Sequence, residues 1–144
     1  MNLLDHFDHQ EKKQDKEHFF DLIQIAFADG VVDKNETEML HRLGKKKGFT
    51  DAEIDNLINA TKVNSYNPPY DFFKRFSQIY EIVKMTLADG VIEENEIRLA
   101  SKLATKIGFT ENEIPVLLDL LIKGIKDEKD EDDLFEIFKK QRKR

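Results

Sequence analysis

An acidic phrase occurs twice in the chain, as ADGVVDKNE over residues 28–36 and as ADGVIEENE over residues 88–96. Each copy places carboxylates at its second, sixth and ninth positions. Carboxylate oxygens suit hard cations such as Ca²⁺, Mg²⁺ or Mn²⁺ better than they suit Zn²⁺ or Cu²⁺. The phrase therefore predicts a site for a hard divalent cation, with six candidate ligands: Asp29, Asp33, Glu36, Asp89, Glu93 and Glu96.

The Asp-Gly pair in each copy favours this interpretation. The helical runs DLIQIAFA and IYEIVKMTLA end at Asp29-Gly30 and Asp89-Gly90, where Gly can adopt the left-handed conformation that stops a helix. A carboxylate at the carboxyl end of a helix faces the negative end of the helix dipole, which costs a few tenths to about 1 kcal/mol. The same cost occurs in both copies, and a bound cation would remove it.

Both acidic joints also have a structural explanation, which the sequence leaves open. Asp-Gly is a common turn pair. Asp33 followed three residues later by Glu36 has the spacing of a capping box. Glu93 and Glu96 repeat this spacing, although Glu caps a helix less well than Asp. The carboxylates are therefore either cation ligands or parts of turns and helix caps.

The spacing matches the second half of an EF-hand calcium loop, but it does not match the first half. Such loops place ligands at positions 1, 3, 5, 7, 9 and 12, with Gly at position 6. With Gly30 at position 6, Asp29 falls at position 5 and Glu36 at position 12. Positions 1 and 3 then fall on Ile25 and Phe27, whose side chains cannot bind a cation. Each copy therefore supplies half a site, and two copies brought together could complete one.

The repeat extends beyond the acidic phrase, because residues 18–58 align without a gap with residues 78–118. The segments KKKGFTDAEI and TKIGFTENEI each contain a Gly that stops one helix. A Thr N-cap with Glu three residues later then starts the next helix. Phe49 and Phe109 occupy the position of a hydrophobic staple. These features predict two copies of one helical unit.

The resulting prediction is an all-α fold of about seven helices, arranged as a bundle of two halves related by a pseudo-twofold axis. A single domain is expected over residues 1–144. Residues 59–71, which contain an Asn-Pro-Pro sequence, form the expected connector between the copies. Residues 127–144 form an expected C-terminal helix, which starts acidic and ends basic as the helix dipole favours.

The repeated phrase, followed by an amphipathic helix and GFT, resembles the TerB family of tellurite-resistance proteins. The likeness extends from about His18 to Leu121, and ADGVIEENEIRLASKLATKIGFTENEI is the closer copy. The resemblance implies a helical bundle of two pseudo-symmetric halves with a divalent-cation site at the six acidic residues. It also implies a cytoplasmic stress-response protein that acts with a protein partner, such as a membrane protein of the TerC type, at the inner face of the membrane. Lys34 interrupts the first acidic run, so the first copy is expected to bind a cation more weakly or not at all.

Composition limits the classes of function that the chain can have. The 144 residues carry a formal net charge of -6, so a general attraction to nucleic-acid phosphates is not expected. The chain has no Cys, which excludes disulfides, thiolate metal sites and Cys nucleophiles. No apolar run approaches the roughly 20 residues that span a bilayer. Tellurite is an anion that the acidic joints would repel, so a role in resistance would be indirect.

These observations lead us to expect a cation-binding sensor or adaptor that is not an enzyme. The alternative is a metal-free protein-interaction module, in which the acidic joints are only turns and helix caps. A metal-dependent hydrolase is a third class, disfavoured because the joints contain no His.

Overall fold

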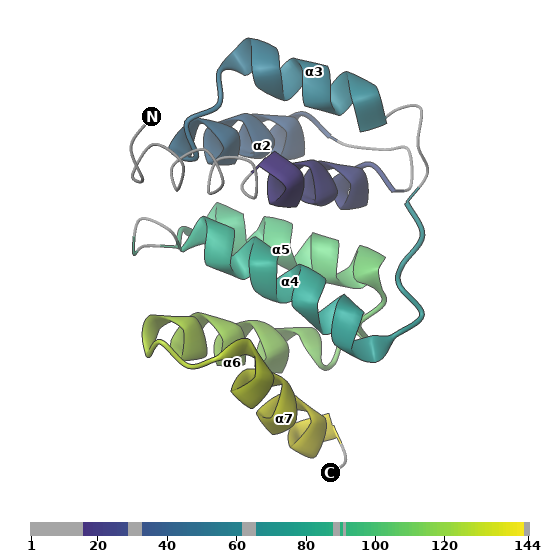
Figure 1. Cartoon of the computed structure of the whole chain (residues 1–144), viewed down its shortest axis with the longest axis vertical. Helices are drawn as coiled ribbons and strands as arrows, with labels where there is room; N and C mark the ends of the chain where they lie inside the picture. Colours follow the sequence, from purple (N-terminus) through teal and green to yellow (C-terminus); the bar gives the residue numbers. More distant parts are fainter. Residues whose placement is uncertain (1–15, 29–32, 62–65, 88–89, 91, 143–144) are drawn as a thin grey trace, which may run out of the picture. The chain divides into compact units, whose positions relative to one another are not determined.

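The computed structural model of the chain describes residues 16–28, 33–61, 66–87, 90 and 92–142. These residues form seven helices and no strand, which confirms the predicted all-α class (Figure 1). The chain divides into two compact units, unit 1 over Met1–Tyr66 and unit 2 over Asn67–Arg144. The division falls within the expected connector. The single domain and the pseudo-twofold relation stay predictions.

Three helices form the described part of unit 1: residues 16–26, α2 (Lys34–Lys46) and α3 (Asp51–Thr61). The joint between α2 and α3 has the predicted chemistry. Gly48 has a φ of 91°, in the left-handed region. Thr50 Oγ1 accepts the Glu53 N–H at 3.1 Å, and Glu53 Oε1 accepts the Thr50 N–H at 3.1 Å. The predicted capping box is confirmed, and it starts α3 directly after the turn.

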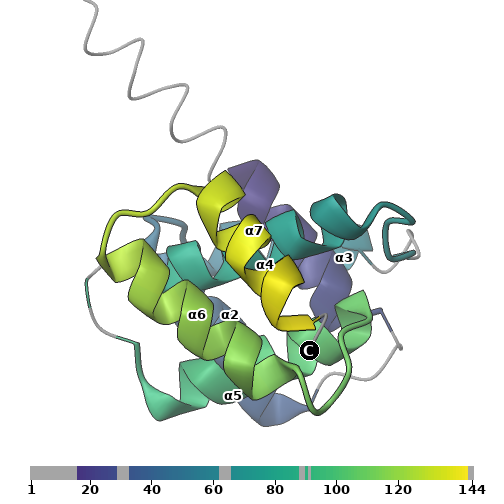
Figure 2. The same ribbon diagram turned by 90° about the horizontal axis from the view of Figure 1, so that it is seen from below.

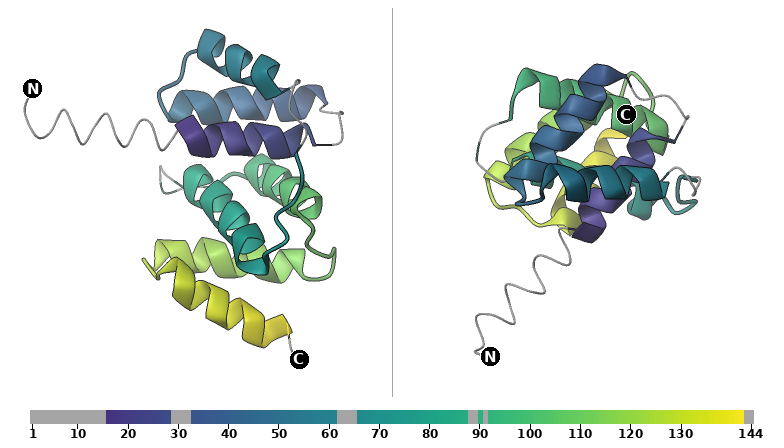
Figure 3. Two further views of the ribbon diagram at one scale, coloured as in Figure 1. Left: turned by 45° about the vertical axis from the view of Figure 1, so that its right-hand side comes forward. Right: turned by 90° about the horizontal axis from the view of Figure 1, so that it is seen from above.

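The core of unit 1 depends on a close approach of α2 and α3 at Gly44, where α3 crosses α2 (Figure 3). A Cβ atom at Gly44 would lie 2.6 Å from Ile54 Cδ1 and 2.8 Å from Phe19 Cζ. Phe19 in turn stacks on Phe49, with ring centroids 5.4 Å apart. Glycine is therefore required where the helices of this unit meet.

Four helices form the described part of unit 2: α4 (Phe72–Thr86), α5 (Glu94–Ile107), α6 (Ile114–Lys126) and α7 (Glu131–Arg142). The helices α4, α5 and α6 each contact the other two. They correspond in the repeat to residues 16–26, α2 and α3. The last helix, α7, has no counterpart among the described helices of unit 1, and it lies across α4 and against α6 (Figure 2).

Helix α7 packs onto unit 2 through phenylalanine rings. Phe138 is 1% exposed, and its ring centroid lies 5.8 Å from Phe76, 6.0 Å from Phe109 and 6.1 Å from Phe72. The Arg142 guanidinium lies 4.3 Å above the Phe72 ring, a cation–π distance. We call the six rings that contact one another in this way the Phe cluster: Phe72, Phe73, Phe76, Phe109, Phe135 and Phe138.

The start of α6 differs from the sequence prediction. Glu113 Oε1 accepts the Thr110 N–H at 2.9 Å, as expected for a capping box. Regular helix nevertheless begins only at Ile114, and residues 111–113 form a turn. Pro115 accounts for the delay, because it has no N–H to donate to the carbonyl four residues earlier. Unit 1 has Asp55 at the corresponding position, and there the helix begins at once.

The end of α6 is a Schellman motif. Lys129 N–H donates to the Gly124 carbonyl at 2.9 Å, and Glu128 N–H donates to the Ile125 carbonyl at 3.0 Å. Glu128 occupies the left-handed position, with a φ of 60°. Because residues 127–130 form this ending, α7 begins at Glu131 and is shorter than the helix expected over residues 127–144. The connector expected over residues 59–71 also begins later than predicted, because α3 continues to Thr61.

Glu128→Gly is expected to raise the free energy of unfolding by about 0.5–1 kcal/mol. Gly adopts a positive φ without the clash of a Cβ atom, and the greater freedom of Gly in the unfolded chain offsets part of this gain. Urea unfolding followed by circular dichroism measures the difference. Glu128→Ala is the control, because it removes the same charge and keeps the Cβ atom. A Gly variant no more stable than the Ala variant would contradict the prediction.

Candidate functional site

Four of the six predicted ligands lie in the described part of the chain, and all four stand at the start of a helix. Asp33 is the N-cap of α2, and Glu36 lies in its first turn. Glu93 is the N-cap of α5, and Glu96 lies in its first turn. The structure therefore brings the carboxylates together in pairs, one pair in each unit.

The pair in unit 2 forms a capping box around an enclosed carboxylate. Glu96 Oε1 accepts the Glu93 N–H at 3.0 Å. The Glu96 side chain is 0% exposed, and it is the one buried carboxylate-bearing residue in the described part of the chain. Removal of a carboxylate from water is costly unless hydrogen bonds or a cation compensate it. Glu96 is thus the most unusual acidic residue of the joint.

The pair in unit 1 has a similar arrangement with less burial. Asp33 Oδ1 accepts the Glu36 N–H at 2.8 Å, and the Asp33 carbonyl accepts the Thr37 hydroxyl at 3.1 Å. Glu36 is half-buried as a residue, and its Oε2 atom is shielded from solvent. The same repeat position therefore holds an inward-facing carboxylate in both units, which is fully enclosed only in unit 2.

The other two predicted ligands, Asp29 and Asp89, lie outside the described residues, so the argument from the helix dipole stays a prediction. The described residues around Asp89 show that α4 ends at Thr86, earlier than expected. Thr86 Oγ1 donates to the Val83 carbonyl at 2.8 Å, which satisfies a carbonyl at the end of the helix. Gly90 has the predicted left-handed φ of 85°, but it lies four residues after the last residue of α4 and not at the predicted position directly after the helix.

A hard cation fits the donor chemistry of the four described carboxylates. A carboxylate offers about four lone-pair sites, so an oxygen that accepts a capping N–H still leaves capacity for a cation. In the described ranges, however, no group of three or more His, Asp and Glu side chains could hold a metal ion. A complete shell would accordingly need Asp29 or Asp89 in addition to the helix-start pair.

A second polar cluster, which sequence reasoning missed, joins α2 to α3. His41 Nδ1 lies 2.9 Å from Asp51 Oδ1, and His41 Nε2 lies 3.0 Å from Asp55 Oδ1. Lys45 Nζ lies 3.1 Å from Asp51 Oδ2. Hydrogen bonding from His41, then from Lys45, holds the pKa of Asp51 below its usual value. The available signal was the spacing, since each helix carries its two residues four positions apart, on one face.

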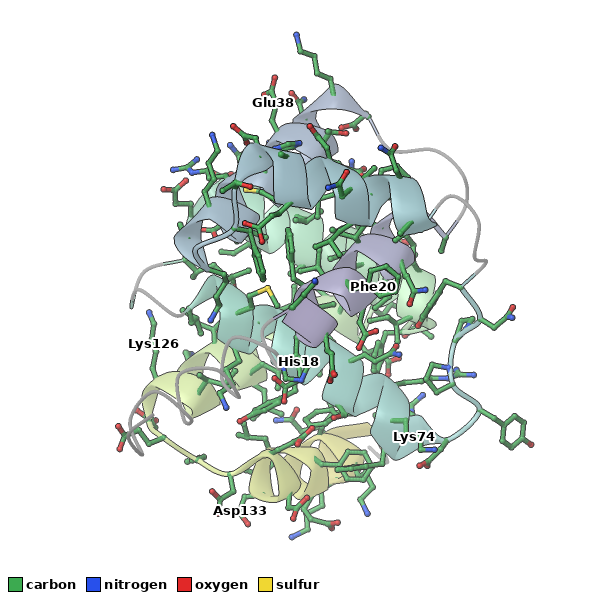
Figure 4. All side chains as sticks on the ribbon, turned by 45° about the horizontal axis from the view of Figure 1, so that its top comes forward. His18, Phe20, Glu38, Lys74, Lys126 and Asp133 are labelled. Atoms are coloured by element: carbon green, nitrogen blue, oxygen red, sulfur yellow. The ribbon has the colours of Figure 1, made fainter. Side chains whose placement is uncertain are left out.

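Most charged side chains outside these clusters in the described residues are exposed, and Figure 4 shows Glu38, Lys74 and Asp133 pointing away from the helices. Glu113 is an exception, because its Oε2 atom lies 2.9 Å from Arg142 Nε and its side chain is 15% exposed. This ion pair ties the start of α6 to the end of α7.

Comparisons of the chain with protein-family models, with curated proteins and with solved structures give no match. The resemblance to TerB proteins therefore rests on the motifs given above. No helix in the part of the chain that the structure describes has the length and apolar character needed to cross a membrane.

Proposed function

We propose that the protein binds a hard divalent cation at its acidic joints and acts as a sensor or adaptor rather than as an enzyme. The observation that carries this proposal is the complete burial of Glu96 in a phrase that the chain contains twice. A carboxylate removed from water attracts a cation more strongly, because the surroundings screen its charge less. Its position in the first turn of α5 also limits its freedom, so little entropy is lost on binding.

Within one joint, the proposed ligands come from both sides of the turn. Glu93 and Glu96 stand at the start of α5. Asp89, directly before Gly90, lies four residues before Glu93 in the sequence. Ca²⁺ takes six to eight oxygen ligands, so backbone carbonyls and water would complete the shell. The joint in unit 1 is proposed to be the weaker site, because Glu36 is less buried than Glu96 and Lys34 adds a positive charge.

The second candidate is a metal-free interaction module, and the capping geometry favours it. Asp33 and the Glu93–Glu96 pair each satisfy a helix-start N–H, which explains these carboxylates without a cation. The two candidates share one fold and differ in whether the acidic joints respond to divalent ions.

The setting of this function is proposed from the resemblance to TerB proteins. It comprises a tellurite-resistance type of stress response in the cytoplasm, and a protein partner such as a TerC-type membrane protein at the inner membrane face. The net charge of -6 argues against nucleic acid as the partner. Any effect on tellurite resistance would be indirect, through cation sensing or assembly.

Addition of the cation is expected to stabilise the folded protein, and Glu96→Gln is expected to abolish this effect. At about 100 times the dissociation constant, a ligand of the folded state adds about 2.7 kcal/mol to the free energy of unfolding. Gln keeps an oxygen that can accept the Glu93 N–H, so the helix cap survives while the charge is lost. Thermal unfolding is measured in Ca²⁺, Mg²⁺, Mn²⁺ or a chelator.

Glu94→Gln provides the matched control. Glu94 lies in the same helical turn, but its side chain is 80% exposed and pairs with Arg98 at 3.0 Å. This variant is expected to keep the full response to the cation. If the melting curves of the wild-type protein coincide in all three cations and in chelator, the metal-free module is the correct function.

A further inference from the structure

We propose that His41, Asp51 and Asp55 form a proton-dependent clamp that fastens α2 to α3. Both ring nitrogens of His41 lie within 3.0 Å of a carboxylate oxygen, and the two carboxylates belong to successive turns of α3. This clamp does not depend on the proposed cation site, because none of its residues belongs to the acidic joints.

The number of protons on the ring decides whether both contacts hold. A neutral imidazole has one N–H donor and one lone-pair acceptor, whereas an imidazolium has two donors. Carboxylates accept hydrogen bonds and do not donate them when ionised. The ring can therefore satisfy Asp51 and Asp55 together only when it is protonated. After loss of the proton, one carboxylate faces a nitrogen lone pair and that contact is lost.

The charge balance of the cluster agrees with this dependence. The charged groups that the structure shows in contact within the cluster are Lys45 and His41 from α2, and Asp51 and Asp55 from α3. With a protonated ring, two positive charges meet two negative charges across the helix pair. With a neutral ring, a single positive charge faces two carboxylates, which then repel each other without full compensation.

The clamp operates in a limited range of pH. Histidine side chains in general change charge between about pH 5 and 8, so a comparison of the two ends of this range tests the clamp. The pKa of Asp51 is lowered, first by the His41 hydrogen bond and then by Lys45. The contribution of Asp51 to stability is therefore fully present above the usual pKa range of a carboxyl group. It is lost as the pH falls and the carboxylate is protonated. The clamp is closed where the ring is protonated and both carboxylates are ionised.

Unit 2 lacks the clamp and serves as an internal comparison. Sixty positions on, Ser101 stands in place of His41, Thr105 in place of Lys45 and Pro115 in place of Asp55. The contact of α5 with α6 therefore has no equivalent proton-dependent link at these positions. Of the two corresponding helix pairs, only α2 and α3 are expected to loosen when the pH rises.

A double-mutant cycle of His41→Gln and Asp55→Ala tests the clamp. Thermal unfolding of the four proteins is measured at about pH 5.5 and about pH 8, at low salt because both carboxylates are more than half exposed. The coupling between the two positions is expected to raise Tm by about 1–3 °C at the lower pH and to vanish at the higher pH. The cycle cancels contributions from the other three histidines. Equal coupling at the two pH values, or none at the lower pH, overturns the proposal.

Hydrogen exchange gives an independent readout within one molecule. After correction for intrinsic exchange rates, amides of α2 and α3 are expected to lose protection between about pH 5.5 and 8 in the wild-type protein. His41→Gln should remove this change and leave amides of α5 and α6 as in the wild type. A pH response of α2 and α3 that survives in His41→Gln contradicts the clamp.

Discussion

Phe138→Ala is expected to lower the free energy of unfolding by about 3–5 kcal/mol. Phe138 is 1% exposed and contacts three rings of the Phe cluster, so truncation leaves a cavity between α7 and the other helices of unit 2. Because a domain is stable by only about 5–15 kcal/mol, a loss of this size threatens folding itself. Guanidinium unfolding, followed by far-ultraviolet circular dichroism, measures the difference.

Two further substitutions in α7 test whether lost packing causes the destabilisation expected for Phe138→Ala. Phe138→Leu keeps most of the apolar volume and should cost about 1 kcal/mol. Gln141→Ala changes an exposed position of the same helix and should fall within about 0.5 kcal/mol of the wild type. If Phe138→Ala costs no more than Gln141→Ala, α7 does not form part of the core of unit 2.

Gly124→Val is expected to cost about 3 kcal/mol, at the upper end of the range for overpacked cores. A Cβ atom at Gly124 would overlap Leu134 Cδ2 and would lie 2.9 Å from Leu134 Cδ1. Leu134 is 0% exposed, so it cannot move aside without displacing its neighbours. The new side chain should force α6 and α7 apart. Chemical unfolding of the variant gives the magnitude.

Lys123→Val is the matched control for Gly124→Val. It introduces the same side chain one position earlier in α6, where the lysine is 74% exposed. The control should lose only about 0.5 kcal/mol, through the lower helix propensity of Val. Gly124→Ala should lie between the two variants. If Gly124→Val loses no more stability than Lys123→Val, the contact with Leu134 does not limit the size of the residue at position 124.

The sequence predicts those features of the fold that depend on neighbouring residues. The Thr50–Glu53 capping box and the left-handed Gly48 involve groups within a few positions of one another, so local rules are sufficient. The start of α6 shows the limit of this approach. The same rules apply to Thr110, but Pro115 removes one donor and delays the regular helix.

Features that depend on contacts between helices could not be predicted in the same way. Nothing local to Gly124 shows that Leu134 will lie against it, and the partners of His41 come from the next helix. The Phe cluster likewise combines rings that are distant in the sequence. Spacing predicts which face of a helix a residue occupies, but the residue that it meets depends on how the helices pack.

The candidate site has one feature that the sequence predicts and one that it does not. The spacing correctly places Asp33 and Glu93 as the N-caps of their helices. It gives no reason for Glu96 to be buried while Glu36 stays partly exposed, because the two glutamates occupy equivalent positions of the repeat. Burial depends on the side chains that surround each joint, and these differ between the copies.

Helix α7, which has no counterpart among the described helices of unit 1, affects the order in which the two units can fold during synthesis. Nascent chains generally acquire structure from the amino end as they leave the ribosome. The described helices of unit 1 are complete before the first residue of α4 is made, whereas the phenylalanine rings of α4 remain exposed to water until Phe138 of α7 has been synthesised. The apolar rings of the later copy of the repeat are therefore expected to stay exposed to water for longer during synthesis.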